Sequence, residues 1–141
     1  MSDLSFAWRL RATCAALLIP PLLSILSFAK VAHWLSVNPA RHADVTDMHL
    51  AHYVRSILAR LSGPWSNTCL RRNTVLYYLL RRAGRDVELE IGVARDAKGR
   101  IEAHAWLVKG GVPFLREDSD APSRFQHIAR FPGGARESVK C

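Results

Sequence analysis

The sequence has few cysteines, and their number and spacing exclude the two structural roles that cysteine most often fills. The three cysteines, Cys14, Cys69 and Cys141, lie far apart, so no framework of disulfide bonds holds this chain together. An odd number of widely spaced thiols is typical of a reducing compartment. The chain also lacks a Cys-x-x-Cys pair and its six histidines are scattered, so we expect no metal ion and no other cofactor.

Acidic residues are also scarce, since 12 Asp and Glu face 20 Lys and Arg and the net charge is +8. The basic residues are dispersed and form no DNA- or RNA-binding motif, so we expect no nucleic-acid partner. An excess of positive charge favours loose contact with anionic partners, such as an acidic peptide or lipid headgroups. No glycine-rich phosphate-binding loop is present, which argues against a nucleotide site.

The 141 residues, of which 49% are hydrophobic, suffice for one domain with one core. Within this single domain we distinguish a helical N-terminal part, residues 1–62, that packs on a core formed by residues 63–132. The remaining residues, 133–141, are polar and contain glycine, so we expect a disordered tail.

Hydrophobic periodicity separates helices from strands. Apolar residues recur at helical spacing over residues 45–61, with Asp44 as the N-cap candidate, and again over residues 68–83. The period changes to the alternation that is typical of strands over residues 87–93, 101–109 and 112–116. We expect the strand 101–109 to lie at the centre of the sheet.

The N-terminal segment allows three interpretations. Residues 14–29 are almost entirely apolar and are flanked by basic residues. One interpretation is a membrane-spanning helix, although the run is shorter than the ~20 residues that a span requires. Another is a secretory signal that is cleaved after residues 27–29. The third is a pair of short helices, joined or kinked at Pro20-Pro21 and packed on the core, because a proline ring blocks a hydrogen bond inside a helix.

Cys69 and His104 carry the main functional signal. Cys69 stands at the start of the predicted helix 68–83, where free N–H groups and the helix dipole stabilise a thiolate. We expect His104, in the strand 101–109, to face this end of the helix while Ala105 packs behind it. A histidine there can take the proton of the thiol and return it to a leaving group. The pair predicts a cysteine peptidase or another acyl-transfer enzyme, whereas the competing interpretation is a structural thiol and a half-buried histidine.

An acid opposite His104 would complete a catalytic triad. A two-residue turn at Gly110-Gly111 sets the register of the hairpin and brings Glu117 opposite His104 on one face of the sheet. An acid at this place orients the imidazole and stabilises its charged form. Asp118 is the alternative, because a slip of one residue exchanges the faces of the strand.

The sequence offers several candidates for the hydrogen-bond donors of an oxyanion hole. The backbone N–H of Cys69 is a natural donor, because it lies at a helix N-terminus. The side chains of Asn67, Trp65 and Trp106 are further candidates for the oxyanion hole or for substrate binding.

Four motifs resemble those of the transglutaminase-like superfamily and, more narrowly, of the small leader peptidases of lasso-peptide biosynthesis. They occur in the order of that family and are Thr68-Cys69-Leu70, Leu79-Leu80-Arg81-Arg82-Ala83-Gly84, Ile91-Gly92-Val93 and His104-Ala105-Trp106. Each motif alone is weak, but the ordered set is fairly specific and covers about half of the chain. The glutamate at position 117 departs from the aspartate that the family usually has there.

The resemblance implies an α+β fold with a transglutaminase-like (papain-like) cysteine-protease core, in which the nucleophile helix packs on a small antiparallel sheet. It implies a cytoplasmic cysteine peptidase that removes the leader from a lasso-peptide precursor through a Cys69 thioester. The implied partners are the precursor peptide, a separate leader-recognition protein and a macrolactam synthetase. It also favours N-terminal helices that pack on the core over a membrane span or a cleaved signal.

Two alternatives remain. One is a transglutaminase or amidase on the same fold, acting on a glutamine side chain or another acyl donor. The other is a non-catalytic basic protein that binds a membrane through residues 6–35, or an acidic partner through its arginines.

Overall fold

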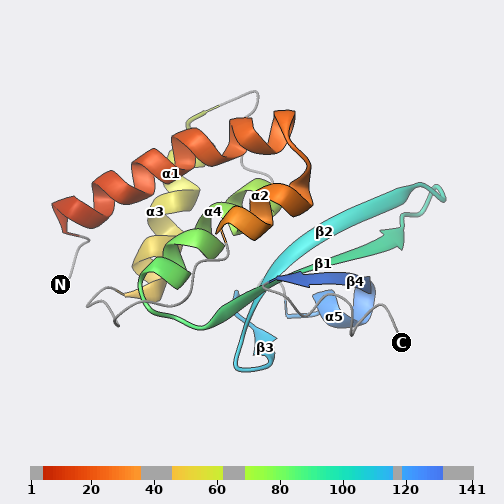
Figure 1. Ribbon diagram of the computed structural model, residues 1–141. Coiled ribbons are helices and arrows are strands. Elements are labelled where there is room, and N and C mark those ends of the chain that lie inside the picture. The colour runs from red at the N-terminus through yellow and green to blue at the C-terminus, as the bar shows by residue number, and fades with distance from the viewer. Residues whose placement is uncertain (1–4, 36–45, 62–68, 116–118, 132–141) are drawn as a thin grey trace.

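The structure is a computed structural model that describes residues 5–35, 46–61, 69–115 and 119–131. A group of helices precedes a sheet in the chain and lies to one side of it (Figure 1). The helices are α1 (Phe6–Ile25), α2 (Phe28–Leu35), α3 (Asp47–Ala59), α4 (Cys69–Arg82) and α5 (Ala121–Arg124). The strands are β1 (Val87–Arg95), β2 (Ile101–Lys109), β3 (Val112–Pro113) and β4 (Gln126–Phe131).

The helices predicted over residues 45–61 and 68–83 are confirmed as α3 and α4. The N-cap of α3 is Thr46, whose side chain makes no capping hydrogen bond. The predicted N-cap Asp44 lies outside the described residues, and so does the tail 133–141.

The sheet is antiparallel with the strand order β3-β2-β1-β4. The strand expected over residues 101–109 at the centre of the sheet is β2, and it is one of the two inner strands. The other inner strand, β1, pairs with β2 along its whole length and with β4 over Leu89–Val93. On its other side β2 pairs only with the two residues of β3. The third strand, expected over residues 112–116, is assigned only as Val112–Pro113, where proline is tolerated because β3 is an edge strand, and the N–H of Phe114 continues the pairing with a hydrogen bond to the carbonyl oxygen of Leu107.

The turn between β2 and β3 confirms the predicted hairpin register as far as the structure describes it. Gly110 and Gly111 have φ angles of 64° and 85°, as a two-residue hairpin turn of the mirror-image type requires. Lys109 pairs with Val112 across this turn.

The two faces of the sheet bury different clusters, because successive side chains of a strand point to opposite sides. One face packs against α1, α3 and α4 and contributes Val87, Leu89, Ala105 and Leu107 to the main core. The other face carries a smaller cluster, in which Trp106 and Val108 of β2 pack with Ala121 and Phe125. The helix with Cys69 at its start therefore covers only one side of β2.

The N-terminal segment contains one long and one short helix, and the break between them lies beyond the prolines. α1 runs without interruption through Pro20 and Pro21, and the chain becomes extended at Leu26. The predicted joint between two short helices at Pro20-Pro21 is therefore wrong, because the break lies at Leu26. The inner side of α1 is fully or nearly buried against α3 and α4 and consists of Ala12, Ala15, Ala16 and Ile19. This packing outweighs the roughly 3 kcal/mol that an interior proline costs a helix.

Asp47 holds together three parts of the fold that are distant in sequence. It lies in the first turn of α3, where a negative charge suits the helix dipole. Its carboxylate accepts hydrogen bonds from Arg85 Nε at 2.7 Å and from Lys109 Nζ at 2.8 Å. Burial by itself would raise the pKa of Asp47, but the hydrogen bonds and charges of Lys109 and Arg85 outweigh it and hold the pKa below its usual value of 3.8.

We expect Asp47→Asn to lower the free energy of unfolding by about 2 kcal/mol at neutral pH, because it removes two charge-assisted hydrogen bonds from a partly buried site. A carboxylate whose pKa is depressed by folding stabilises the fold above the pKa of the unfolded chain. That contribution is lost as the pH falls through the lower folded value. The difference between wild type and variant in urea unfolding should therefore hold down to about pH 5 and shrink below pH 3.8.

Asp86→Asn is the matched control. The side chain of Asp86 is 89% exposed and its nearest cation, Arg81, is 3.6 Å away, so its loss should change the free energy of unfolding by less than about 0.5 kcal/mol. If Asp86→Asn lowered the free energy of unfolding as much as Asp47→Asn, the stabilising role assigned to the Asp47 carboxylate would be contradicted. The same holds if the effect of Asp47→Asn persisted at acid pH.

Candidate active site

Cys69 is the first residue of α4, at the place where the first N–H groups of a helix have no partner within the helix. The first turn of α4 contains no acidic residue, so no carboxylate there opposes a negative charge on sulfur. The structure describes the backbone of Cys69 but not its side chain. The other predicted site residues Trp65, Asn67, Glu117 and Asp118 lie outside the described residues.

His104 lies in β2 and belongs to an aromatic stack. Its ring is stacked on Phe125, with 5.0 Å between centroids and 21° between planes, and on Trp106, with 6.0 Å and 22°. The face that His104 occupies differs from the expectation. Ala105 lies on the side of β2 that packs against α4, and His104 lies with Trp106 and Phe125 on the other side.

A cavity of about 210 Å³ connects the start of α4 to the strand of His104. It is lined by Leu70, Ile91, Ala103, His104 and Ala105. Leu70 directly follows Cys69, so the residue next to the predicted nucleophile and the predicted base line the same space. Ile91 pairs with Ala105, and Ala103 lies two residues before Ala105 in β2, so these three residues line the cavity from the face of the sheet that packs against α4.

Asn73 fastens α4 to β2 directly beside His104. Its side chain is fully buried, and Nδ2 donates a hydrogen bond of 2.7 Å to the carbonyl oxygen of Ala105. Alternate carbonyls of a strand point to the same neighbour. The carbonyl of Leu107 accepts from Phe114 N–H, across the hairpin, at 2.8 Å. Asn73 therefore bonds to the next carbonyl on the same side of β2, that of Ala105. It ties α4, one turn after Cys69, to the residue that follows His104.

The position of Asn73 also bears on the predicted third member of the triad. The register that sets Glu117 opposite His104 requires the hairpin to continue past Ala105. The described residues show it as far as the hydrogen bond between Phe114 and Leu107. At the next carbonyl from the turn, that of Ala105, the donor is the side chain of Asn73 in α4.

Gly92 makes room for the aromatic stack. It pairs with His104 in the neighbouring strand, and a Cβ atom here would lie 2.7 Å from Phe125 Cβ and 2.9 Å from Trp106 Cη2. Real Cβ atoms do not come this close, so the position requires glycine. Trp106, a candidate for substrate binding, is only 1% exposed and forms the floor beneath the His104 ring.

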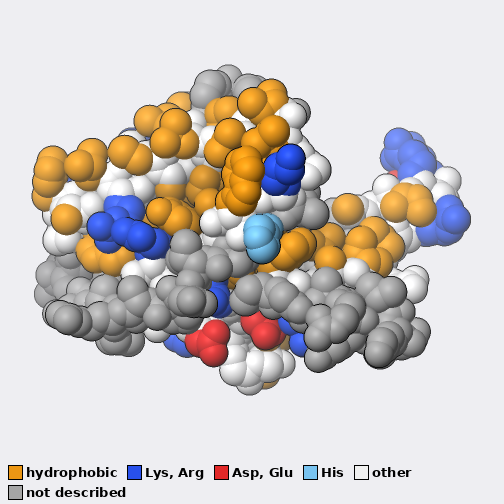
Figure 2. All heavy atoms as spheres, in the orientation of Figure 1, with side chains coloured by type: hydrophobic (Ala, Val, Ile, Leu, Met, Phe, Trp, Pro, Cys, Tyr) orange, Lys and Arg blue, Asp and Glu red, His pale blue; other side chains and the backbone are white. Residues whose placement is uncertain are grey.

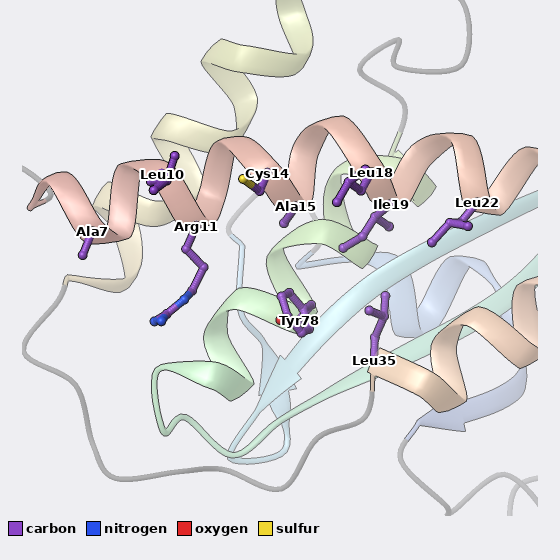
Figure 3. Close-up of a pocket in the computed structure, with 10 residues that line it drawn as sticks. All are labelled: Ala7, Leu10, Arg11, Cys14, Ala15, Leu18, Ile19, Leu22, Leu35 and Tyr78. Carbon is purple, nitrogen blue, oxygen red and sulfur yellow. The ribbon is translucent and has the colours of Figure 1, made fainter.

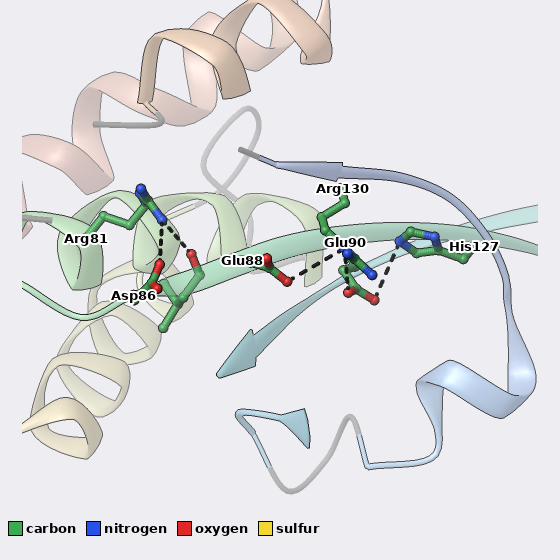
Figure 4. Close-up of polar contacts among 7 residues, drawn as sticks. Arg81, Asp86, Glu88, Glu90, His127 and Arg130 are labelled. Atoms are coloured by element: carbon green, nitrogen blue, oxygen red, sulfur yellow. Dashed lines mark hydrogen bonds and ion pairs between the residues drawn. The ribbon is translucent and has the colours of Figure 1, made fainter. Parts of the chain in front are cut away.

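A second histidine occupies the same face of the sheet and has an acid beside it. His127 of β4 pairs with Gly92, so the two histidines flank this glycine from either side. Nε2 of His127 lies 3.6 Å from the nearly buried carboxylate of Glu90, which also accepts a hydrogen bond of 3.2 Å from Arg130 Nε (Figure 4).

The sequence suggested no functional role for His127 or Glu90. The signal that could have shown the contact between them was the register of β1 against β4, which sets Arg130 opposite Glu90 and His127 opposite Gly92.

The chain matches one known family over most of its length. A model of the transglutaminase-like superfamily matches residues 6–130. The chain belongs to the transglutaminase-like superfamily. Its members are commonly cysteine proteases or acyltransferases, and the α+β fold with a helix packed on an antiparallel sheet agrees with this membership. Neither a search of curated proteins nor a search of solved structures found a match.

The family match begins at the first residue of α1, which the sequence motifs did not suggest. The motifs lie between residues 68 and 106, whereas the matched region includes the N-terminal helices. These helices are therefore part of the family's domain.

We expect Asn73→Leu to lower the free energy of unfolding by about 1–3 kcal/mol, because it leaves the buried carbonyl of Ala105 without this donor. Thr74→Val is the matched control. Thr74 is equally buried, but its hydroxyl donates to Leu70 within α4, so its loss should leave the joint between helix and strand intact and cost less. Urea unfolding of both variants tests this, and equal losses would show that the bond to β2 has no special weight.

Proposed function

We propose that this protein is a cysteine peptidase that removes the leader from a ribosomally made lasso-peptide precursor. The observation that carries the proposal is the cavity shared by His104 and Leu70, the neighbour of Cys69. It supports Cys69 as the nucleophile and His104 as the base, because His104 and the residue that follows Cys69 line the same space. The ordered motifs support the narrower assignment to leader removal.

The proposed reaction has two steps. The Cys69 thiol gives its proton to His104 and the sulfur attacks the carbonyl carbon at the junction between leader and core. The C–N bond breaks, and His104 returns the proton to the amine of the departing core peptide. Water, deprotonated by His104, then attacks the leader thioester, so the C–S bond breaks and the leader leaves as a carboxylic acid.

The dipole of α4 assists both steps, because its free N–H groups face negative charge on sulfur and on the tetrahedral oxygen. The backbone N–H of Cys69 is one donor of this kind. Trp65 and Asn67 precede it in the chain and remain candidates for a second donor.

We place the reaction in the cytoplasm, with three partners. The precursor peptide is the substrate, and a separate leader-recognition protein presents it. A macrolactam synthetase then uses the new N-terminal amine of the core to close the ring. The net charge of +8 supports binding of an acidic leader segment.

The first test is a cycle of variants at Cys69 and His104. We expect Cys69→Ala and His104→Ala each to abolish cleavage of the precursor, and the double variant to be no worse, because residues that act as one unit do not add in rate. Mass spectrometry of the products also separates peptidase from acyl transferase, since transfer to an amine leaves no free leader acid. Near-additive losses would make His104 a structural residue only.

A second test compares the two thiols Cys69 and Cys14. Cys14 is exposed on α1 and serves as an internal control, because access alone should make it react readily. We expect iodoacetamide to label Cys69 faster near neutral pH, since the thiolate is the reactive form and a helix N-terminus favours it. Faster labelling of Cys14 would contradict the assignment of Cys69 as the nucleophile.

The third member of the triad is tested by removing one negative charge at a time. Glu117→Gln should lower the rate of cleavage by orders of magnitude, because the amide cannot stabilise the imidazolium of His104. Asp118→Asn should have a mild effect. The reverse result would mean that the hairpin shifts by one residue after the pair Leu107–Phe114.

A further inference from the structure

The outer side of α1 is as apolar as its buried side. Large apolar side chains recur along one stripe of the helix and are mostly exposed: Phe6 78%, Leu10 54%, Leu18 64% and Ile25 76%. The exposed Cys14 lies on the same stripe. A helix that is apolar all round is normally buried, yet one side of α1 has no partner among the described residues. Figure 2 shows hydrophobic side chains gathered over the region of α1, at the upper left of the molecule.

A groove beside α1 extends this apolar surface towards α2 and α4. It has a volume of about 570 Å³, and its walls include Leu10, Leu18, Leu22 and Leu35 together with Tyr78. Arg11 reaches over the groove from α1, at the end away from Leu35 (Figure 3). The guanidinium of Arg11 also lies over the ring of Trp8, 4.7 Å from its centroid.

The charges around this surface have one sign. Arg9 and Arg11 lie on α1 and Lys30 lies on α2, whereas residues 5–35 contain no aspartate or glutamate. Trp34 on α2 is 57% exposed, and exposed tryptophan with nearby cations is typical of surfaces that rest on lipid headgroups.

We propose that α1 and α2 dock the protein onto an anionic lipid surface. The 20 residues of α1 form one continuous helix about 30 Å long, whose outer side can lie along a flat surface. Leu10, Leu18 and Trp34 enter the headgroup region, and the cations contact lipid phosphates. This docking is independent of the proposed peptidase reaction.

Docking along the surface fits the structure, and crossing the membrane does not. Residues Phe6–Leu23 are long and apolar enough to span a bilayer by length and composition alone. A spanning α1 would have to release Ala12, Ala16 and Ile19 from the core that they form with α4. A helix that lies in the interface keeps this packing and immerses only its outer side.

The test is co-sedimentation of the full chain with lipid vesicles at about 0.1 M salt. One set is phosphatidylcholine alone, and the other contains about a quarter phosphatidylglycerol. We expect binding to the anionic vesicles, weakened by added salt, and little binding to the neutral ones. Equal binding to both sets, or none to either, would overturn the proposal.

Two pairs of substitutions separate the charges from the apolar stripe. Arg9→Gln with Lys30→Gln should lower the partition coefficient about twenty-five-fold, at about fivefold for each cation. Leu10→Ser with Leu18→Ser should lower it at least about tenfold. All four side chains are exposed, so the fold should persist.

The matched control is Ile101→Ser with Val112→Ser, two exposed apolar residues on β2 and β3 that should not change binding. If this control loses as much binding as the α1 variant, the surface is not specific and the proposal fails. Analytical ultracentrifugation without lipid tests whether the apolar stripe binds a second copy of the chain instead of lipid. A dimer that Leu10→Ser with Leu18→Ser dissociates would assign the stripe to self-association and overturn lipid docking.

Discussion

The packing of α4 across one face of β1 and β2 is the constraint on which the rest of the molecule depends. It joins Val75, Leu76 and Leu79 of α4 and the inward-facing residues of both strands in one buried core, and it sets the N-terminal end of the helix beside the cavity that His104 also lines. The hydrogen bond from Asn73 to Ala105 fixes how far the helix can slide along the strand. Hydrophobic packing tolerates small shifts, whereas a buried hydrogen bond does not, so this bond determines the position of Cys69 relative to the histidine strand.

The elements that local patterns determine could be predicted from the sequence. The helix of Cys69, the strands on either side of the Asp96–Gly99 turn and the Gly110-Gly111 hairpin follow from periodicity and from residues that favour turns. The path of α1 could not be predicted in this way. Two adjacent prolines argue locally for a break, and only the packing of alanines on distant helices overrides them.

The features of the candidate site likewise divide into those that the local sequence determines and those that depend on contacts with distant residues. A cysteine at the start of a helix is a local feature, and the structure has it there. The face on which His104 lies depends on which side of the sheet the helices cover, and alternation along the strand cannot decide between the two sides. The requirement for glycine at position 92 comes from Phe125, which is distant in sequence. The acid beside His127 depends likewise on the pairing of β1 with β4.

The contacts of Asp47 have a consequence for how the chain folds. Its partners are 38 and 62 residues away in sequence, and the hydrogen bond between Thr13 and Tyr53 spans 40 residues. Asp47 thus links the N-terminal helices to the turn after α4 and to β2, and α4 shares one core with α1 and α3 on one side and with β1 and β2 on the other. Such a topology favours all-or-none folding, slower than that of a bundle with local contacts. Residues 6–59 and the sheet should therefore unfold in a single transition and should not be separable by truncation.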